Sequence, residues 1–215
     1  MTAETYQKGL DYLEPLQLQI PSWMKQIKEF GIDTYVPIVQ DDMGRFLRMM
    51  VQVERPKRIL EIGCGISYST HWMLLSGVDC KITAVDANHE RLDYCREILK
   101  VSGYESQVEL HHLYADEYFQ QSQGGFDLIF QDAAKKAYAG MIEECYKNLK
   151  VGGLFIVDNI FYNNKVYIPR DKLLTKFRNG VDKLNEFNHI MASHEGFECS
   201  FFAISDGVLV ARKIR

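Results

Sequence analysis

The sequence predicts an α/β fold: a seven-stranded, mostly parallel sheet with helices on both faces and an antiparallel hairpin at its C-terminal end. After residue 56, short apolar segments alternate with amphipathic segments of helical spacing, which is typical of β-α-β units. Near the C-terminus, two strand-like runs are separated by Ser205-Asp206-Gly207, and Asp-Gly in such a position is a hairpin signal. Because a tight turn joins antiparallel strands, one strand of the hairpin should run against the rest of the sheet.

The order of the expected elements follows from the spacing of apolar residues. The first 55 residues should be helical, because Met43, Leu47 and Val51 recur at helical spacing. Parallel strands are expected at residues 58–62, 81–86, 108–112, 126–131 and 154–158. Helices are expected between them at residues 69–75, 89–101, 115–121 and 136–149. A helix over residues 171–190 should precede the hairpin strands at residues 197–204 and 208–213.

Length and composition limit the class of protein. The 215 residues, of which 47% are hydrophobic, suit one domain over residues 1–215. Within it, a helical segment at 1–55 should contribute to the acceptor site, and the core at 56–215 should bind the cofactor and the metal. No apolar run approaches the roughly 20 residues of a membrane span, and no signal peptide is expected. The five cysteines never form a C-x-x-C pair, so the cytoplasm is the expected compartment. A net charge of −4 gives no support to a domain-wide nucleic-acid surface.

The loop after the first strand favours a nucleoside cofactor. It reads Glu61-Ile-Gly63-Cys-Gly65, and its glycines allow a sharp turn and the close approach of a ligand. A dinucleotide fingerprint would need a glycine at position 68, where Tyr68 stands. A cofactor without phosphates, such as S-adenosylmethionine, therefore fits better than NAD. Glycine turns also follow strands in many α/β proteins, so the loop alone is a modest signal.

Three further side chains are candidates for contacts with this cofactor. Asp86 ends the second strand, where a carboxylate can accept hydrogen bonds from both ribose hydroxyls. Glu61 should orient the loop or meet the amino group of the cofactor. Ser69 begins the next helix, where its hydroxyl and the helix N-terminus could hold a carboxylate. The alternative for Asp86 is a simple cap of the following helix.

The fourth and fifth expected strands run into a second group of polar residues. Asp132 follows one strand, and Asp158 with Asn159 follows the other. Parallel strands end at the same edge, so two carboxylates and an amide oxygen should converge there as ligands for Mg²⁺, or for Mn²⁺ or Ca²⁺. Taken singly, Asp132 could be a helix cap and Asp158-Asn159 a turn.

Lys135 stands three residues beyond Asp132 and could face the same site. A phenol has a pKa near ~10, and a bound divalent ion lowers it. Cationic surroundings would depress the pKa of Lys135 too, which makes it a candidate general base. The phenolate would then attack a sulfonium methyl group in line. Taken alone, Lys135 could equally be a surface lysine.

These segments resemble the cation-dependent O-methyltransferases, the group of catechol and caffeoyl-CoA O-methyltransferases and their bacterial relatives. The resemblance rests on residues 59–65, 126–135 with Tyr138, 157–159 and 204–208. It implies a Rossmann-like class I methyltransferase fold, a homodimer, metal ligands at Asp132, Asp158 and Asn159, and catalytic roles for Lys135 and Asp132. The cofactor contacts that it implies, together with the loop glycines, are Val39, Glu61, Gly63, Gly65, Ser69, Asp86, Ala115 and Asp132.

The sequence departs from the family pattern at four places. Ser67 replaces a glycine, Leu113-Tyr114 precedes Ala115 where Gly-Asp is usual, Asp86 stands where Glu is more common, and Asn164 replaces a glycine. The expected function is methylation of a catechol-like or enolic hydroxyl of a small molecule. The main alternative is methylation of 5-hydroxyuridine in tRNA, for which the basic stretch 165–183 could contact phosphates. A binding protein without chemistry and an NAD-dependent oxidoreductase are further alternatives. Tyr68 and the antiparallel tail disfavour the latter.

Overall fold

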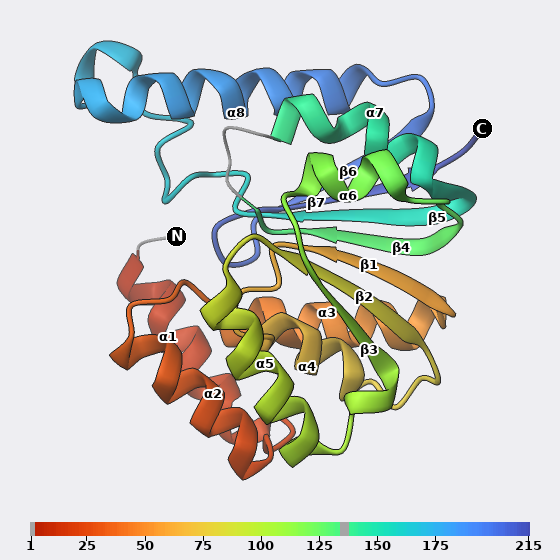
Figure 1. Cartoon of the computed structure of the whole chain (residues 1–215). Helices are drawn as coiled ribbons and strands as arrows, with labels where there is room; N and C mark the ends of the chain where they lie inside the picture. Colours follow the sequence, from red (N-terminus) through yellow and green to blue (C-terminus); the bar gives the residue numbers. More distant parts are fainter. Residues whose placement is uncertain (1–2, 134–137) are drawn as a thin grey trace.

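A seven-stranded sheet forms the centre of the protein (Figure 1), seen in a computed structural model that describes residues 3–133 and 138–215. The strand order is β3-β2-β1-β4-β5-β7-β6. The strands are β1 (Arg58–Ile62), β2 (Lys81–Asp86), β3 (Val108–His112), β4 (Phe126–Gln131), β5 (Leu149–Asp158), β6 (Phe197–Phe202) and β7 (Val208–Lys213). Strands β1 to β5 pair in parallel, whereas β7 lies antiparallel between β5 and β6. The predicted fold class is confirmed.

Helices cover both faces of the sheet (Figure 1). They are α1 (Ala3–Leu13), α2 (Ser22–Asp33), α3 (Asp41–Glu54), α4 (Tyr68–Leu74), α5 (His89–Ser102), α6 (Ala115–Gln121), α7 (Tyr138–Asn148) and α8 (Thr175–Ser193). Short 3₁₀ turns lie at Glu14–Leu16, Glu105–Gln107 and Arg170–Lys172. Helices α2 to α5 pack on one face, and α6 to α8 pack on the other. The expectation of an N-terminal helical segment is confirmed.

The two cores follow from the alternation of side chains along the buried strands. In β1, Ile59 belongs to the core beneath α2 to α5, whereas its neighbour Leu60 belongs to the core beneath α6 to α8. In β4, Leu128 and Ile129 divide in the same way. Since successive residues of a strand point to opposite faces, a run of apolar residues is what a sheet covered on both sides requires.

Several element boundaries differ from the predicted ones. Strand β5 begins at Leu149 and not at 154, because residues between Leu149 and Leu154 bulge out of the pairing with β4. Gly152 makes this bulge possible with φ +83°. Helix α8 begins at Thr175 and not at 171, because Leu173 and Leu174 have extended backbone. Strand β6 ends at Phe202 and not at 204.

The sheet topology fixes where a ligand can bind. From β1 the chain proceeds to β2 and β3 on one side, whereas β4 is followed by β5 on the other. The strand order therefore reverses between β1 and β4, and ligands of open parallel sheets bind beyond the strand ends at such a point. The segment 34–40, between α2 and α3, reaches the same edge of the sheet. No helix in the described part of the chain is long and apolar enough to cross a bilayer.

Candidate active site

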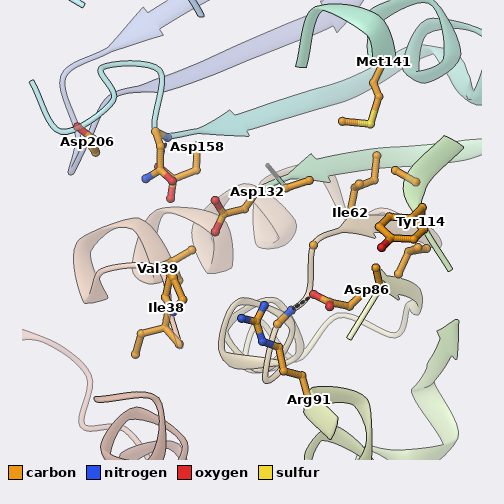
Figure 2. A pocket seen from close by; sticks show the side chains of 18 of the residues that line it. Ile38, Val39, Ile62, Asp86, Arg91, Tyr114, Asp132, Met141, Asp158 and Asp206 are labelled. Carbon is orange, nitrogen blue, oxygen red and sulfur yellow. Dashed lines mark hydrogen bonds between the residues drawn. The ribbon is translucent and has the colours of Figure 1, made fainter. Parts of the chain in front are cut away.

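A cavity of about 930 Å³ lies at the carboxyl ends of β1, β2, β4 and β5. Figure 2 shows Asp158 and Asp206 toward one end of it and Tyr114 and Arg91 toward the other. Eight of the residues predicted from the sequence line this cavity: Val39, Gly63, Gly65, Asp86, Ala115, Asp132, Asp158 and Asn159. The two groups of residues that were recognised separately in the sequence thus meet in one cavity.

Gly63 allows the ends of β1 and β4 to come together. Its φ is +87°, and a Cβ added there would lie 2.7 Å from the backbone oxygen of Asp132. The Asp132 amide donates to the carbonyl oxygen of Ile62 at 3.0 Å. The reason for a glycine at 63 is therefore the backbone directly after β4, and not only the approach of a ligand. Gly65 is different, because a Cβ there would meet nothing closer than 3.9 Å.

Asp86 holds the loop after β1 by direct hydrogen bonds. Its Oδ2 accepts from the amide of Gly65 at 2.9 Å, and its Oδ1 accepts from the amide of Asn88 at 2.9 Å. A carboxylate has about four lone-pair positions, so both oxygens can accept further hydrogen bonds from a ligand. Asp86 therefore fits the predicted contact with ribose hydroxyls while also fixing the loop.

Glu61 and Ser69 lie beneath the loop and are absent from the lining of the cavity. Glu61 is 0% exposed, and it accepts hydrogen bonds from the hydroxyls of Ser69 and Thr70. Burial raises the pKa of Glu61 to about 7, although the two hydroxyls oppose the shift. This arrangement ties α4 to the end of β1. The expected direct contact of these two side chains with a cofactor stays a prediction.

Asp132 and Asp158 follow directly opposed positions of neighbouring strands. Gln131 of β4 pairs with Val157 of β5, and each aspartate is the next residue along its strand. Adjacent strands lie about 4.8 Å apart, so the two aspartates are close neighbours at the sheet edge. Asp158 is 1% exposed, and its Oδ1 accepts from the amide of Asn159 at 2.7 Å.

The phenol of Tyr138 lies near the negatively charged end of the cavity. Tyr138 is fully buried at the start of α7, and its hydroxyl donates to the carbonyl oxygen of Asp158 at 3.2 Å. Burial, and then the negative charges of Asp132, Asp158 and Asp206, hold the pKa of Tyr138 well above its ordinary value. Three carboxylates therefore share this region.

The oxygen-rich end of the cavity fits a hard divalent cation. Two carboxylates and an amide oxygen are ligands that Mg²⁺ accepts, and a buried carboxylate such as Asp158 requires a cation or hydrogen-bond donors nearby. Within residues 3–133 and 138–215, no three His, Cys, Asp or Glu side chains form a metal-binding group. A cation held by Asp132 and Asp158 would therefore take its third protein ligand from the amide oxygen of Asn159. Lys135, the predicted base, lies outside the described residues.

Several residues of the cavity were not recognised in the sequence. Asp206 was assigned only to a turn, since Asp-Gly is sufficient explanation for a hairpin. Pro37, Ile38 and Gln40 join Val39 in the wall, from a segment that has no periodicity of its own. Arg91 and Tyr114 also line the cavity. Tyr114 stands where the family usually has Asp, and this departure was the one feature of the sequence that could have marked it as a cavity residue.

Comparison of the sequence with known proteins identifies one family. The family model described as O-methyltransferase matches residues 17–214. Similar proteins include a caffeoyl-CoA O-methyltransferase of Eucalyptus gunnii, which is 29% identical in an alignment of 204 residues that covers 91% of this chain and 82% of that protein. Another is a caffeoyl-CoA O-methyltransferase of Medicago sativa, which is 30% identical in an alignment of 185 residues that covers 81% of this chain and 74% of that protein.

Solved structures share the fold over nearly the whole chain. A methyltransferase of Podospora anserina with bound S-adenosylhomocysteine has a TM-score of 0.88 at 24% identity and covers 100% of this chain and 97% of its own. An O-methyltransferase of Bacillus cereus, also in complex with S-adenosylhomocysteine, has a TM-score of 0.82 at 23% identity and covers 94% and 96%. At these identities the likeness concerns the fold.

Proposed function

The chain belongs to the O-methyltransferase family, and we propose that it transfers a methyl group from S-adenosylmethionine to an aromatic or enolic hydroxyl of a small molecule, with the help of a divalent cation. The predicted family and enzyme class are thereby confirmed. The observation that carries the finer proposal is that Asp132, Asp158 and Asn159 line the same cavity as Gly63, Gly65 and Asp86. The cavity thus combines groups for a nucleoside with groups for a hard cation.

We assign the two ends of the cavity to the two substrates. The end with Asp86, Tyr114 and Ala115 would take the nucleoside of S-adenosylmethionine, which supplies an electrophilic methyl group on a sulfonium sulfur. The end with Asp132 and Asp158 would take the acceptor hydroxyl. Because both ends belong to one cavity, acceptor oxygen and methyl group can be held close together, and this proximity lowers the entropic part of the barrier.

The chain's own residues would bring the acceptor hydroxyl to its reactive form. Asp132, Asp158 and Asn159 would hold the divalent cation, which when bound stabilises the deprotonated acceptor oxygen. Lys135 is assigned as the base that accepts the hydroxyl proton. Transfer to the oxygen removes one negative and one positive charge, so walls that exclude water, such as Ile38 and Val39, favour it.

A catechol-like small molecule is the acceptor that we favour. The relatives reported above are named for caffeoyl-CoA, whose caffeoyl group carries two adjacent aromatic hydroxyls. They give no support to the tRNA alternative. In the basic stretch 165–183, Arg170 pairs with Asp182 at 3.1 Å, and Arg178 donates to the carbonyl oxygen of Leu173 at 3.1 Å. These guanidinium groups already have partners within the protein.

The expected homodimer stays a prediction.

The test combines activity with cofactor binding. Labelled S-adenosylmethionine and Mg²⁺ are offered with catechols and, separately, with undermethylated tRNA. Label transfer to catechols only is expected. Asp158→Ala should lower this transfer about 100-fold or more. It should leave the affinity for S-adenosylhomocysteine, measured by calorimetry without metal, within about twofold, because the predicted nucleoside contacts lie at the other end of the cavity.

Asp79→Ala is the matched control, since Asp79 is exposed and precedes β2 at the opposite edge of the sheet. Asp79→Ala should change neither the label transfer to catechols nor the affinity for S-adenosylhomocysteine. Full activity of Asp158→Ala in the presence of a chelator would refute the metal-dependent chemistry. Transfer to tRNA but not to catechols would refute the small-molecule acceptor.

A further inference from the structure

The loop after Asn159 has an unusual backbone conformation. Asn159, Tyr162, Asn163 and Asn164 all have left-handed φ values, between +51° and +62°. Single asparagines adopt this region readily, but a bulky residue such as Tyr162 does so only at a cost. Such a conformation persists when surrounding contacts determine it, and it is concentrated at functional sites. The question is therefore which contacts hold this loop beside the predicted metal ligands.

The hairpin between β6 and β7 holds the loop by four hydrogen bonds. The Ile160 amide donates to the carbonyl oxygen of Gly207 at 3.1 Å, and the Phe161 amide donates to that of Asp206 at 2.9 Å. The carboxylate of Asp206 then accepts from the amides of Asn163 at 2.7 Å and Asn164 at 3.3 Å. Successive backbone N–H groups in a turn can form a concave site for an anion, and here the Asp206 side chain accepts from two of them.

Helix α8 holds other parts of the same loop. Asn188 donates from Nδ2 to the carbonyl oxygen of Ile160 at 3.1 Å. A Cβ at Gly180 would lie 2.7 Å from Cε1 of Tyr162, so the tyrosine ring lies directly against the backbone of α8. These contacts fix Ile160 and Tyr162, whereas the Asp206 carboxylate fixes the next two residues. The loop is thus held between α8 and the hairpin.

We propose that Asp206 is a positioning residue: it shapes the loop 159–164 so that Asn159 and the acceptor end of the cavity keep their places. The inference rests on the proposed function, because it assigns Asn159 to the metal. Asp206 also lines the cavity with Asp132 and Asp158, as Figure 2 shows. Loss of its charge should therefore affect the cation and the acceptor, and should spare the nucleoside end near Asp86.

The experiment compares two Asp→Asn variants of the whole protein. Asp206→Asn keeps the size of the side chain but turns an amide donor toward the backbone N–H groups. Asp127→Asn is the matched control, because Asp127 also accepts from two backbone amides, those of Lys57 and Arg58, both at 2.9 Å. It does so at the start of β4, at the opposite edge of the sheet. Urea unfolding shows whether each variant is folded. If Asp206→Asn does not fold, Asp206→Ser replaces it.

Three quantities are measured. Mn²⁺ binding, followed by the electron paramagnetic resonance of the free ion, should weaken about tenfold in Asp206→Asn. Limited trypsin digestion should cleave after Lys165 about tenfold faster, because the loop loses two of its hydrogen bonds. The dissociation constant of S-adenosylhomocysteine without metal should change less than twofold. Asp127→Asn should leave Mn²⁺ binding and cleavage after Lys165 unchanged.

If Asp206→Asn and Asp127→Asn change Mn²⁺ binding and cleavage after Lys165 equally, Asp206 only stabilises the fold, and the proposal is overturned. Unchanged Mn²⁺ binding and unchanged cleavage after Lys165 in Asp206→Asn would overturn it as well. If the wild-type protein binds no Mn²⁺, the proposed metal dependence fails. In that case the cleavage rate after Lys165 alone decides whether Asp206 positions the loop.

Discussion

Glu61 is a fully buried carboxyl group at the end of β1, directly before the loop that carries Gly63. Burial disfavours its charged form, whereas the hydroxyls of Ser69 and Thr70 favour it, and the balance leaves its pKa at about 7. The ordinary value is 4.5. Between these two pH values, the folded chain holds a proton on Glu61 that the unfolded chain has lost, so folding and protonation are coupled.

The sign of this coupling gives a prediction for Glu61→Gln. The stabilisation that Glu61 contributes is fully present below pH 4.5 and is lost as the pH rises through 7. From pH 5 to pH 8, the free energy of unfolding of the wild type should therefore fall by about 2 kcal/mol relative to that of the variant. Urea unfolding at several pH values measures the difference. Glu97→Gln, at an exposed site, serves as control. Parallel curves for wild type and Glu61→Gln would contradict the assigned pKa.

At the scale of residues, the sequence predicted where site residues lie better than it predicted which side chains bond to one another. The convergence of Asp132, Asp158 and Asn159 could be expected, because parallel strands end at one edge of a sheet. The pairing of Glu61 with Ser69 could not, since it depends on how α4 packs against β1. The contact of Asp206 with a loop more than 40 residues away was equally hidden. The Asp206-Gly207 turn motif accounts for the hairpin but does not indicate that Asp206 also binds a loop elsewhere in the chain.

The crossing of α3 and α4 depends on a glycine in the middle of a helix. A Cβ added at Gly44 would lie 2.3 Å from the indole of Trp72, which is a rigid and almost fully buried ring. Glycine is otherwise a poor helix residue, by about 1 kcal/mol relative to alanine. The close approach of the two helices must outweigh this cost. The glycine therefore serves packing between elements and not a turn.

Two Gly→Ala substitutions should have opposite effects on stability. Gly44→Ala should lower the free energy of unfolding by about 2 kcal/mol, because the indole of Trp72 must move. Gly9→Ala in α1 should raise it by up to about 1 kcal/mol, because nothing lies within 4 Å of the added Cβ. Urea unfolding of both variants provides the comparison. Stabilisation by Gly44→Ala would show that the helix crossing has more space than the structure indicates.

The elements themselves were largely predictable, and the errors have local causes. Apolar runs predicted the central strands β1, β4 and β5, because a sheet buried on both faces needs them. The start of β5 was placed too late, because the apolar run begins only at Leu154, whereas the pairing with β4 begins at Leu149, before the bulge. The start of α8 was placed too early, because apolar Leu173 and Leu174 suit a helix but are extended.

At the scale of the whole molecule, a chain of polar contacts joins helices α2 and α3 to the start of α4, directly after the loop that follows β1. Lys28 of α2 pairs with Asp41 of α3 at 2.8 Å, and the hydroxyl of Tyr68 donates to Asp41 at 2.8 Å. Burial, and then the charge of Asp41, raise the pKa of Tyr68, so its hydroxyl stays protonated as a donor. The wall segment 37–40 lies directly before Asp41, and Val39 within it lines the cavity. The sequence predicted an N-terminal helical segment that contributes to the acceptor site, but not the contacts that join it to Tyr68.

This connection predicts that Tyr68→Phe weakens cofactor binding although Tyr68 is not among the residues that line the cavity. Loss of a hydrogen bond to a carboxylate should loosen segment 37–40, and the affinity for S-adenosylhomocysteine should fall about fivefold. Calorimetry measures the affinity, and hydrogen exchange should show faster exchange at residues 38–40. Tyr146→Phe is the control, because it removes a hydroxyl that donates to the carbonyl oxygen of Arg215 at the C-terminus. An unchanged affinity in Tyr68→Phe would mean that the N-terminal helices and the cofactor loop are independent. A fivefold loss with unchanged exchange at residues 38–40 would instead place the effect in the loop after β1.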